Sequence, residues 1–308
     1  MSLTWQALDR NVMNCQTIAV LLTCHNRKEK TLTSLDSLFH QDLGADFSLA
    51  VYLVDDGSTD GSSEAIAQRY PQTNILQGNG NLFWNGGMRK AFAAALDVGH
   101  DYYLWLNDDT ILYPHSLSTL LTTHQQLSEQ GQPNSIIAGS TQDPDTEEWT
   151  YGGFRQLGWW YPPFKCAPVK PTDTPQLCDL MCGNIVLIPQ AVTAVVGNLD
   201  PSLTHYAGDW DYGLRAKQKG CKVWITPGYL GTCARNPKPD PANTPDLQKG
   251  LEKIETPKGL ALQSVTLHPW DEWKLLMQRH GGVLWPLFWI LPYRKLLFPK
   301  LFDRNSDA

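Results

Sequence analysis

Two adjacent carboxylates, Asp108 and Asp109, follow a short apolar stretch after a single intervening Asn107. This stretch, YYLWL at 102–106, has the length and composition of a strand that is buried on both faces of a parallel sheet. Carboxylates at the end of such a strand repel each other and lose hydration, so a cation or hydrogen-bond donors are expected beside them. Their oxygens suit Mg²⁺ or Mn²⁺ bridging phosphates. The alternative is a solvated turn in which an Asp caps the next helix.

A second acidic pair, Asp55 and Asp56, ends the apolar run 50–54. The residues from Asp56 onward begin like a calcium loop, but Ala67 stands at the twelfth position, where a bidentate Glu is required. The calcium hypothesis is therefore rejected, and the pair is expected to face another ligand at the strand end. One of three polar residues is expected to cap the next helix: Ser58, Thr59 or Asp60.

A third candidate is Asp209, which lies in GDWDYGLRAKQKG at 208–220. The pattern predicts a helix that begins near residue 208 and ends at Gly220. Residues two apart on a helix point about 200 degrees from each other, so Asp209 and Asp211 cannot face one pocket. Asp211 has Arg215 four residues later as an ion-pair partner, whereas Asp209 has none. We expect Asp209 to face a substrate, with N-capping as the alternative.

Gly86 and Gly87 are expected to open a helix within GNGNLFWNGGMRKAFAAALDVG at 78–99. Glycines there let backbone N–H groups approach an anion, and Arg89 and Lys90 could reach a diphosphate. Solvated charges are the alternative for both basic residues. The stretch lacks the ending of a Walker loop and the spacing of a dinucleotide fingerprint. The small residues that follow are expected to pack closely: Ala91, Ala94, Ala95 and Val98.

Alternation of apolar runs and helical patterns predicts an α/β fold with a single, mostly parallel central sheet flanked by helices. The predicted strands cover 17–23, 50–54, 74–77, 102–106, 135–139, 184–188 and 222–226. Predicted helices cover 28–39, a segment up to about residue 70, 115–130, a short segment up to 196, and 208–220. The first strand stops at a polar group made of Cys24, His25, Asn26 and Arg27.

The alternation of predicted strands and helices is interrupted between the strands at 135–139 and 184–188 and ends after residue 235. Residues 141–176 are rich in Pro, Gly and aromatics, which indicates irregular hairpins and loops. Three aromatic residues there either cover a sugar or acceptor or plug a small sheet: Trp159, Trp160 and Tyr161. Prolines between 236 and 257 indicate a lid or linker. We therefore predict a main α/β domain at 1–235 and a C-terminal extension at 236–308.

The C-terminal extension contains a helical pattern at 270–280 and an apolar, aromatic run at 281–302. Prolines break this run, and it is too short to span a bilayer. Arg294, Lys295 and Lys300 interleave with the aromatics, which fits a peripheral position on an anionic membrane surface. Packing on the main domain or on a subunit partner is the alternative.

Composition limits the cellular compartment and the classes of binding partner that are expected. The chain has 308 residues with 25 basic and 31 acidic side chains, a formal charge of -6, which argues against a nucleic-acid binder. Its seven cysteines do not form a disulfide-type pattern, and the start MSLTWQALDR lacks the blocks of a signal peptide. A cytoplasmic location is expected, with a peripheral position at the inner face of the membrane if the extension binds lipid.

Five motifs in order, TCHNR, VYLVDDGSTD, NGGMRKAF, WLNDDT and GDWDYGLRAKQKG, resemble the inverting family-2 glycosyltransferases with the GT-A fold. NGNLFWNGG, GDWDYGLRA and the aromatic tail resemble the rhamnosyltransferase-like branch more loosely. The resemblance covers about residues 17–230. It implies transfer of a sugar from a dTDP- or UDP-linked donor to a hydroxyl of a carbohydrate or lipid-linked saccharide, with inversion, as in surface polysaccharide synthesis.

The resemblance also implies roles for individual residues. Asp209 would be the general base, Asp109 the ligand of Mg²⁺ or Mn²⁺, and Asp108 the contact to the ribose. Asp56 would contact the nucleotide base. The other expected donor-site residues are Thr23, His25, Asn26, Arg27, Asp55, Asn81, Gly86, Gly87 and Arg89. Gly208 stands where the family has Glu, and Asn-Asp-Asp replaces Asp-x-Asp, so metal binding is expected to depend on the donor diphosphate.

Three other functions fit the sequence less well. A phosphatase with an aspartyl nucleophile needs Asp-x-Asp-x-Thr, a spacing that Asp108, Asp109 and Thr110 do not have. A sugar-nucleotide pyrophosphorylase would need a Gly-rich basic loop at the first strand, where TCHNRKE stands. A non-enzymatic carbohydrate-binding protein would explain the aromatics but not the acids. Donor sugar and acceptor depend on loops 141–180 and 231–270, whose sequence does not specify them.

Overall fold

The computed structural model describes residues 15–204, 207–235 and 269–294. The chain divides into two compact units, one with Met1–Arg155 and Pro168–Ala234, the other with Gln156–Ala167 and Arg235–Ala308. The segment expected to be a lid or linker lies outside the described residues, and so do Lys295 and Lys300. The domain boundary expected after residue 235 therefore stays a prediction, while 156–167 groups with the C-terminal helices.

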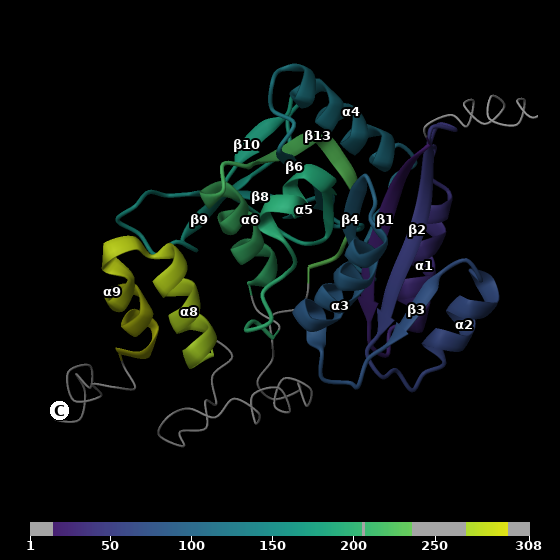
Figure 1. Cartoon of the computed structure of the whole chain (residues 1–308), viewed down its shortest axis with the longest axis horizontal. Helices are drawn as coiled ribbons and strands as arrows, with labels where there is room; N and C mark the ends of the chain where they lie inside the picture. Colours follow the sequence, from purple (N-terminus) through teal and green to yellow (C-terminus); the bar gives the residue numbers. More distant parts are fainter. Residues whose placement is uncertain (1–14, 205–206, 236–268, 295–308) are drawn as a thin grey trace, which may run out of the picture. The chain divides into compact units, whose positions relative to one another are not determined.

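The first unit is built on a ten-stranded sheet with the order β10-β13-β6-β12-β4-β1-β2-β3, to which β5 and β7 add at β13 and β6 (Figure 1). Its strands are β1 Gln16–Cys24, β2 Phe47–Asp55, β3 Asn74–Gln77, β4 Tyr102–Leu106, β5 Ile111–Leu112, β6 Ser135–Gln142, β7 Trp149–Tyr151, β10 Gln176–Cys178, β12 Ile185–Pro189 and β13 Lys222–Thr232. The half β4-β1-β2-β3 is parallel, and β12 enters antiparallel between β4 and β6.

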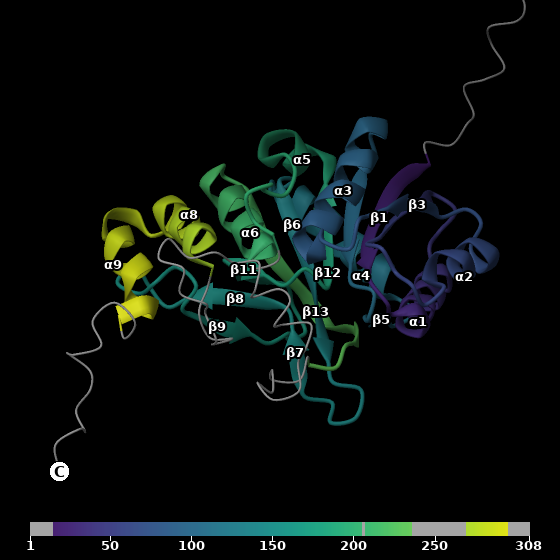
Figure 2. The same ribbon diagram turned by 90° about the horizontal axis from the view of Figure 1, so that it is seen from below.

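Helices cover both faces of this sheet. They are α1 Lys28–Phe39, α2 Ser62–Arg69, α3 Phe83–Val98, α4 Ser116–Glu129, α5 Gln190–Val196 and α6 Gly208–Gln218. Side chains alternate along β1, so Ala19 and Leu21 join the core beneath α3, α5 and α6, whereas Val20 and Leu22 join the core beneath α1, α2 and α4 (Figure 2). The predicted α/β fold with a central sheet and flanking helices is confirmed.

Strand register brings the polar ends of three strands to one edge. Cys24 at the end of β1 pairs with Asp55 at the end of β2, and Leu21 of β1 pairs with Trp105 of β4. The backbone N–H of Asn107 continues the sheet by donating to the carbonyl of Asn184, at 3.1 Å. Because the parallel strands end together, the segments that follow them form one continuous polar edge.

Two local expectations were wrong. Helix α3 begins at Phe83, so Gly86 and Gly87 lie inside its first turns rather than at its start. Val98 is 68% exposed, so it does not pack in the core, whereas Ala91 and Ala95 do as expected. The expected irregular hairpins are present as short strands, and β11 Leu180–Met181, β8 Gly153–Gln156 and β9 Cys166–Val169 form a second, three-stranded sheet.

The second unit contains α8 Trp270–His280, η1 Gly282–Leu284, α9 Trp285–Ile290 and η2 Leu291–Tyr293. Among the helices that the structure describes, none is long and apolar enough to cross a membrane. Trp159 and Trp160 are 65% and 67% exposed, so the expectation that they plug a small sheet was wrong.

Candidate active site

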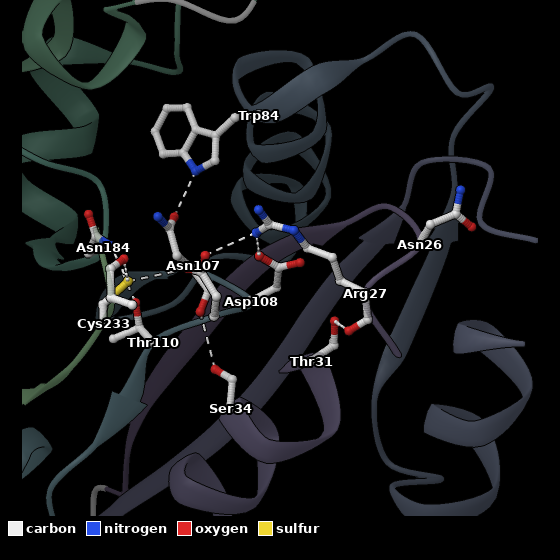
Figure 3. A network of polar contacts seen from close by, with 12 residues as sticks. Asn26, Arg27, Thr31, Ser34, Trp84, Asn107, Asp108, Thr110, Asn184 and Cys233 are labelled. Carbon is white, nitrogen blue, oxygen red and sulfur yellow. Dashed lines mark hydrogen bonds and ion pairs between the residues drawn. The ribbon is translucent and has the colours of Figure 1, made fainter. Parts of the chain in front are cut away.

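The acidic pair after β4 is bridged by an arginine from the neighbouring strand end. Nη1 of Arg27 donates to Oδ1 of Asp108 at 2.9 Å and to Oδ2 of Asp109 at 3.0 Å (Figure 3). Burial raises the pKa of Asp108 to about 6, while Arg27 opposes this rise. The cation that two desolvated carboxylates require is therefore a guanidinium in this structure.

The position of Arg27 follows from the tight turn between β1 and α1. Asn26 has a positive φ of 50°, and its side-chain oxygen accepts from the backbone N–H of Thr59 at 2.8 Å. The carbonyl of Arg27 then accepts from the backbone N–H of Thr31 at 2.9 Å, which begins α1. The backbone of Arg27 is thus fixed by the helix start, while its side chain reaches the end of β4.

The other oxygen of Asp109 faces a group that sequence reasoning missed. The thiol of Cys233 donates to Oδ1 of Asp109 at 3.5 Å. Burial raises the pKa of this thiol to about 12, so it stays protonated and remains a donor. Asn184 donates to Thr110 at 3.4 Å and to the Cys233 sulfur at 3.5 Å (Figure 3). These residues come from three distant parts of the chain, and no local motif marks them.

Asp55 and Asp56 are occupied by the loops around them. Asp55 accepts from the backbone N–H of Ser58 at 2.8 Å. Asp56 accepts from the N–H groups of Gly80 and Leu82, both at 2.8 Å. Their carboxylates thereby fix the turns that follow β2 and β3, and a direct contact of either one to a nucleotide stays a prediction.

The expected first-strand residues lie beside these turns. His25 donates through Nδ1 to the carbonyl of Asp56 at 2.7 Å. Thr23 lies under Gly87, where a Cβ would approach the Thr23 hydroxyl to 2.1 Å. Gly87 is therefore required for the close approach of α3 to β1. The backbone N–H of Gly86 donates to the carbonyl of Leu82 at 3.0 Å, so it is used within α3, and a contact of Gly86 to a donor stays a prediction.

The remaining donor-site candidates on this side have different surroundings. Asn81 is exposed in the turn before α3, and its backbone N–H donates to Oδ1 of Asn79 at 3.1 Å. Arg89 is half-buried in α3. Lys90 donates to the carbonyl of Gln77 at 2.5 Å, which occupies it at the end of β3.

Asp209 lies at the start of α6 and is held by backbone donors. Its Oδ2 accepts from the N–H of Gly183 at 2.9 Å, and its Oδ1 accepts from the N–H of Trp210 at 2.8 Å. Burial raises the pKa of Asp209 to about 6, although both hydrogen bonds act in the opposite direction. Because the bond to Gly183 comes from another segment, the carboxylate does more than cap its own helix.

The partner of Asp211 is the one that the spacing predicted. Nε of Arg215 donates to Asp211 at 2.7 Å, and Asp211 is fully buried. Arg215 also donates to the carbonyls of Val196 and Asn198, both at 3.0 Å. This ion pair fastens α6 to the segment after α5, so Asp211 has a structural role, while the expected contact of Asp209 to a substrate stays a prediction.

Asn85 gives a structural reason for the glycine at position 208, where the resemblance leads one to expect Glu. A Cβ at position 208 would lie 1.9 Å from Oδ1 of Asn85, so a Glu there would collide with it. Asn85 is fully buried and donates to the carbonyl of Asp200 at 3.0 Å. The segment before α6 is thus held by an amide of α3, in a space that a glycine leaves open.

Trp84 joins the two acidic sites. Its indole N–H donates to Oδ1 of Asn107 at 2.8 Å, directly before Asp108 (Figure 3). On the other side, a Cβ at Gly183 would lie 2.3 Å from the Trp84 ring, and Gly183 is the donor to Asp209. No role was predicted for this tryptophan from the sequence. It contacts the residue after β4 on one side and, on the other, Gly183, which donates to Asp209 at the start of α6.

Backbone strain is concentrated around this site. Three non-glycine residues in the left-handed region flank it: Asn26 before α1, Phe83 at the start of α3 and Ala207 before α6, with φ between 50° and 57°. Such conformations persist only where the surrounding structure enforces them, and they are common at ligand sites.

A divalent metal would find oxygen ligands here but not a complete cage. Within the described ranges, no cluster of three or more His, Cys, Asp or Glu side chains could hold a metal ion. Asp109 and its neighbour Asp108 supply hard oxygen atoms that fit Mg²⁺ or Mn²⁺. The fit therefore requires further oxygen atoms from a bound ligand such as a diphosphate.

A model of the family described as glycosyl transferase family 2 matches residues 19–187, more than half of the chain. The chain belongs to this family. An N-acetylglucosaminyl-diphospho-decaprenol L-rhamnosyltransferase of Mycobacterium tuberculosis is 25% identical over 235 residues, which cover 68% of this chain and 71% of that protein. The same relative is found in two strains of that organism.

A solved structure has the same fold as this family-2 glycosyltransferase. The mannosyltransferase PcManGT from Pyrobaculum calidifontis, in complex with GDP-Man and Mn²⁺, matches with a TM-score of 0.52 and 13% identity, over 94% of this chain and 76% of that one. The protein is thus a glycosyltransferase with the predicted GT-A fold. The hypotheses of a non-enzymatic carbohydrate-binding protein and of a pyrophosphorylase receive no support.

Proposed function

We propose that this glycosyltransferase transfers a sugar from a nucleotide-diphosphate donor to an acceptor hydroxyl with inversion, and that Asp209 is the general base. The observation that carries the proposal is a buried carboxylate with a pKa of about 6 that Trp84 connects to the acidic pair after β4. A base with this pKa is ionised at neutral pH and still basic enough to take a hydroxyl proton.

Inversion needs one base and one leaving-group site on opposite sides of the sugar. Asp209 provides the first, and the edge with Asp108 and Asp109 provides the second. A retaining reaction through a covalent intermediate would need a nucleophile beside the anomeric carbon. The arrangement of one acid at α6 and two at β4 favours the single displacement.

The leaving-group site would hold the diphosphate through Asp109 and Mg²⁺ or Mn²⁺. The metal, when bound, would neutralise the charge that develops on the diphosphate as the glycosidic bond breaks. Asp108 would contact the ribose, and Asp56, His25 and Asn26 would form the base site. In this proposal Arg27 neutralises the acidic pair until the donor arrives and then turns to the diphosphate.

The relative from Mycobacterium suggests the substrate class. By this likeness the transferred sugar is a rhamnose-type deoxyhexose, and the acceptor is a saccharide on a lipid diphosphate. The dTDP- or UDP-linked donor and a role in surface polysaccharide synthesis are the ones implied by the sequence motifs. Such an acceptor would place the enzyme at the cytoplasmic face of a membrane, in line with the aromatic C-terminal extension.

Turnover of a panel of nucleotide sugars tests the proposal. The protein is incubated with each donor and a short-chain lipid-diphosphate acceptor, and released nucleotide and glycosylated product are measured together. One donor is expected to give both, with the new bond of opposite anomeric configuration by NMR. Retained configuration, or no product with any donor, would contradict the proposal.

A further inference from the structure

The second unit presents two tryptophans to solvent. Trp159 and Trp160 are 65% and 67% exposed, and their rings stack with centroids 3.5 Å apart. Exposed tryptophans are uncommon on a protein surface that meets only water, because each ring carries a large apolar area. Stacking on each other covers one face of each ring, so the pair is exposed as a single apolar projection.

The loop that carries this pair is held in place. The backbone N–H of Leu157 donates to the carbonyl of Lys165 at 3.3 Å, and that of Tyr161 donates to Gly158 at 3.2 Å. The ammonium group of Lys165 lies 4.5 Å from the centre of the Tyr161 ring. The two exposed tryptophans are therefore carried by a closed loop, and the cation in this loop lies over the ring of Tyr161.

The loop packs on the C-terminal helices. The ring of Phe164 lies 5.7 Å from that of Trp273 in α8, and the indole N–H of Trp273 donates to the carbonyl of Phe288 in α9 at 3.3 Å. On the same helical segment, Val283 is 89% and Leu287 is 53% exposed. The loop 156–167 and the segment from η1 to α9 thus form one body with two exposed apolar parts.

Charge separates this body from the rest of the chain. Its described residues carry five basic side chains, Lys165, Arg235, Lys274, Arg279 and Arg294, and two acidic ones, Asp271 and Glu272, a net charge of +3. The whole chain has a formal charge of -6. The unit also holds six of the twelve tryptophans, namely Trp159, Trp160, Trp270, Trp273, Trp285 and Trp289.

We propose that loop 156–167 and α9 form a docking surface for an anionic lipid bilayer, with Trp159 and Trp160 inserted at the level of the headgroups. Tryptophan and tyrosine prefer this region, where an apolar ring and a polar edge are both satisfied. Short helices with exposed apolar residues and nearby basic residues lie in the interface plane and do not span it. The net positive charge selects anionic over zwitterionic lipid.

A protein partner would also bury the two tryptophans, but the observations favour lipid. Basic side chains from three separate segments outnumber the acidic ones in the unit that carries the apolar projection, as expected for a body that meets many phosphate groups. The inference also agrees with the lipid-carried acceptor proposed above. Binding to vesicles is measured without donor or acceptor, so the inference stands if that proposal fails.

Vesicle sedimentation of the full chain tests the docking surface. At low salt, the wild type is expected to sediment with vesicles of phosphatidylcholine mixed with phosphatidylglycerol, and weakly with phosphatidylcholine alone. The double variant Trp159→Ala, Trp160→Ala should bind at least about tenfold more weakly. Lys165→Gln and Arg294→Gln should each lower binding about fivefold and only on anionic vesicles.

Two controls make the result specific. Val98→Ala with Val195→Ala removes exposed apolar side chains of the first unit, which are 68% and 44% exposed, and should leave binding unchanged. Trp159→Phe with Trp160→Phe keeps the apolar rings, so this variant should retain most binding. It still tests the surface if the alanine variant fails to fold. In the wild type, brominated lipids should quench a fluorescence component that this phenylalanine variant lacks.

Three results would overturn the inference. The first is a wild type that does not sediment with anionic vesicles. The second is an alanine variant that binds as well as the wild type. The third is a stable dimer, seen by analytical ultracentrifugation, that the alanine variant converts to monomer, since the tryptophans would then cover each other between two copies.

Discussion

The two acidic sites of this glycosyltransferase are neutralised in different ways. Asp108 and Asp109 share the guanidinium of Arg27, whereas Asp209 accepts backbone N–H groups from Gly183 and Trp210. Burial nevertheless raises the pKa of both Asp108 and Asp209 to about 6. The first site can exchange one cation for another, while the second holds a carboxylate by neutral donors only, which keeps it basic.

In the proposed reaction, this difference would suit the pair after β4 to a leaving group and Asp209 to a hydroxyl proton. Arg27 lowers the pKa of Asp108, but burial outweighs this effect, so the two carboxylates differ in their partners and not in the value of their pKa. Asp209 meets only peptide dipoles, so protonation at the right moment costs little.

The largest effect is expected for Asp209→Asn, which removes the proton acceptor but keeps the size of the side chain. Transfer should fall by about two to four orders of magnitude, with donor affinity unchanged. The melting temperature at pH 7 should not fall through loss of the charge. The folded pKa of Asp209 is raised, so ionisation between its unfolded value and about pH 6 works against the fold. Initial rates, donor titration and thermal unfolding measure the three quantities.

Asp211→Asn is the matched control for this variant, two residues away on α6. It breaks the buried pair with Arg215, so its main effect should be a lower melting temperature. At a temperature where it stays folded, its transfer rate should be close to wild type. The reverse pattern, with an inactive Asp211 variant and an active Asp209 variant, would exchange the roles assigned to the two acids.

The next effect concerns Asp109→Asn in the site after β4. Donor affinity in the presence of Mn²⁺ should fall about one hundredfold, because the carboxylate would act on the diphosphate through the metal in both ground and transition states. Calorimetry with a nucleoside diphosphate, with metal or with chelator, measures this. Asp101→Asn, at the other end of β4, is the control. Equal nucleotide affinity of the wild type with metal and in chelator would refute metal-dependent binding.

A smaller and opposite effect is expected for Arg27→Gln. Removing the guanidinium that bridges Asp108 and Asp109 should increase the affinity for Mn²⁺ alone by about tenfold, since the metal no longer competes with a resident cation. Electron paramagnetic resonance of free Mn²⁺ reports this without any donor. Arg69→Gln, which breaks an exposed pair with Asp36 elsewhere in the unit, should change nothing. Unchanged or weaker Mn²⁺ binding by Arg27→Gln would show that Arg27 is not a placeholder.

Sequence predicted those parts of the molecule that depend on local pattern. The bounds of α1 and β3 matched, because their apolar spacing and flanking polar residues lie within one segment. The ion pair of Asp211 with Arg215 was equally accessible, since four residues on a helix always meet. The common edge that gathers Asp108 near the end of β1 followed from parallel strands alone.

The rest of the site depends on contacts between distant segments. Arg27 meets Asp108 across 81 residues and Cys233 meets Asp109 across 124, and neither distance leaves a sequence pattern. Asp56 was expected to face a ligand, but the loop between β3 and α3 needs acceptors for its backbone N–H groups and uses this carboxylate. Trp84 could have been noticed as a large aromatic beside glycines, although only the fold shows that it contacts Gly183.

The pH dependence of kcat, with donor and acceptor saturating, tests the role of Asp209 most directly. We predict that the wild-type kcat falls about tenfold per pH unit below about pH 6, because protonation removes the base, and that kcat is level above this pH. Asp108→Asn should keep this acid limb, while the residual rate of Asp209→Asn should be independent of pH. An acid limb that persists in Asp209→Asn and disappears in Asp108→Asn would contradict the assignment of Asp209 as the general base.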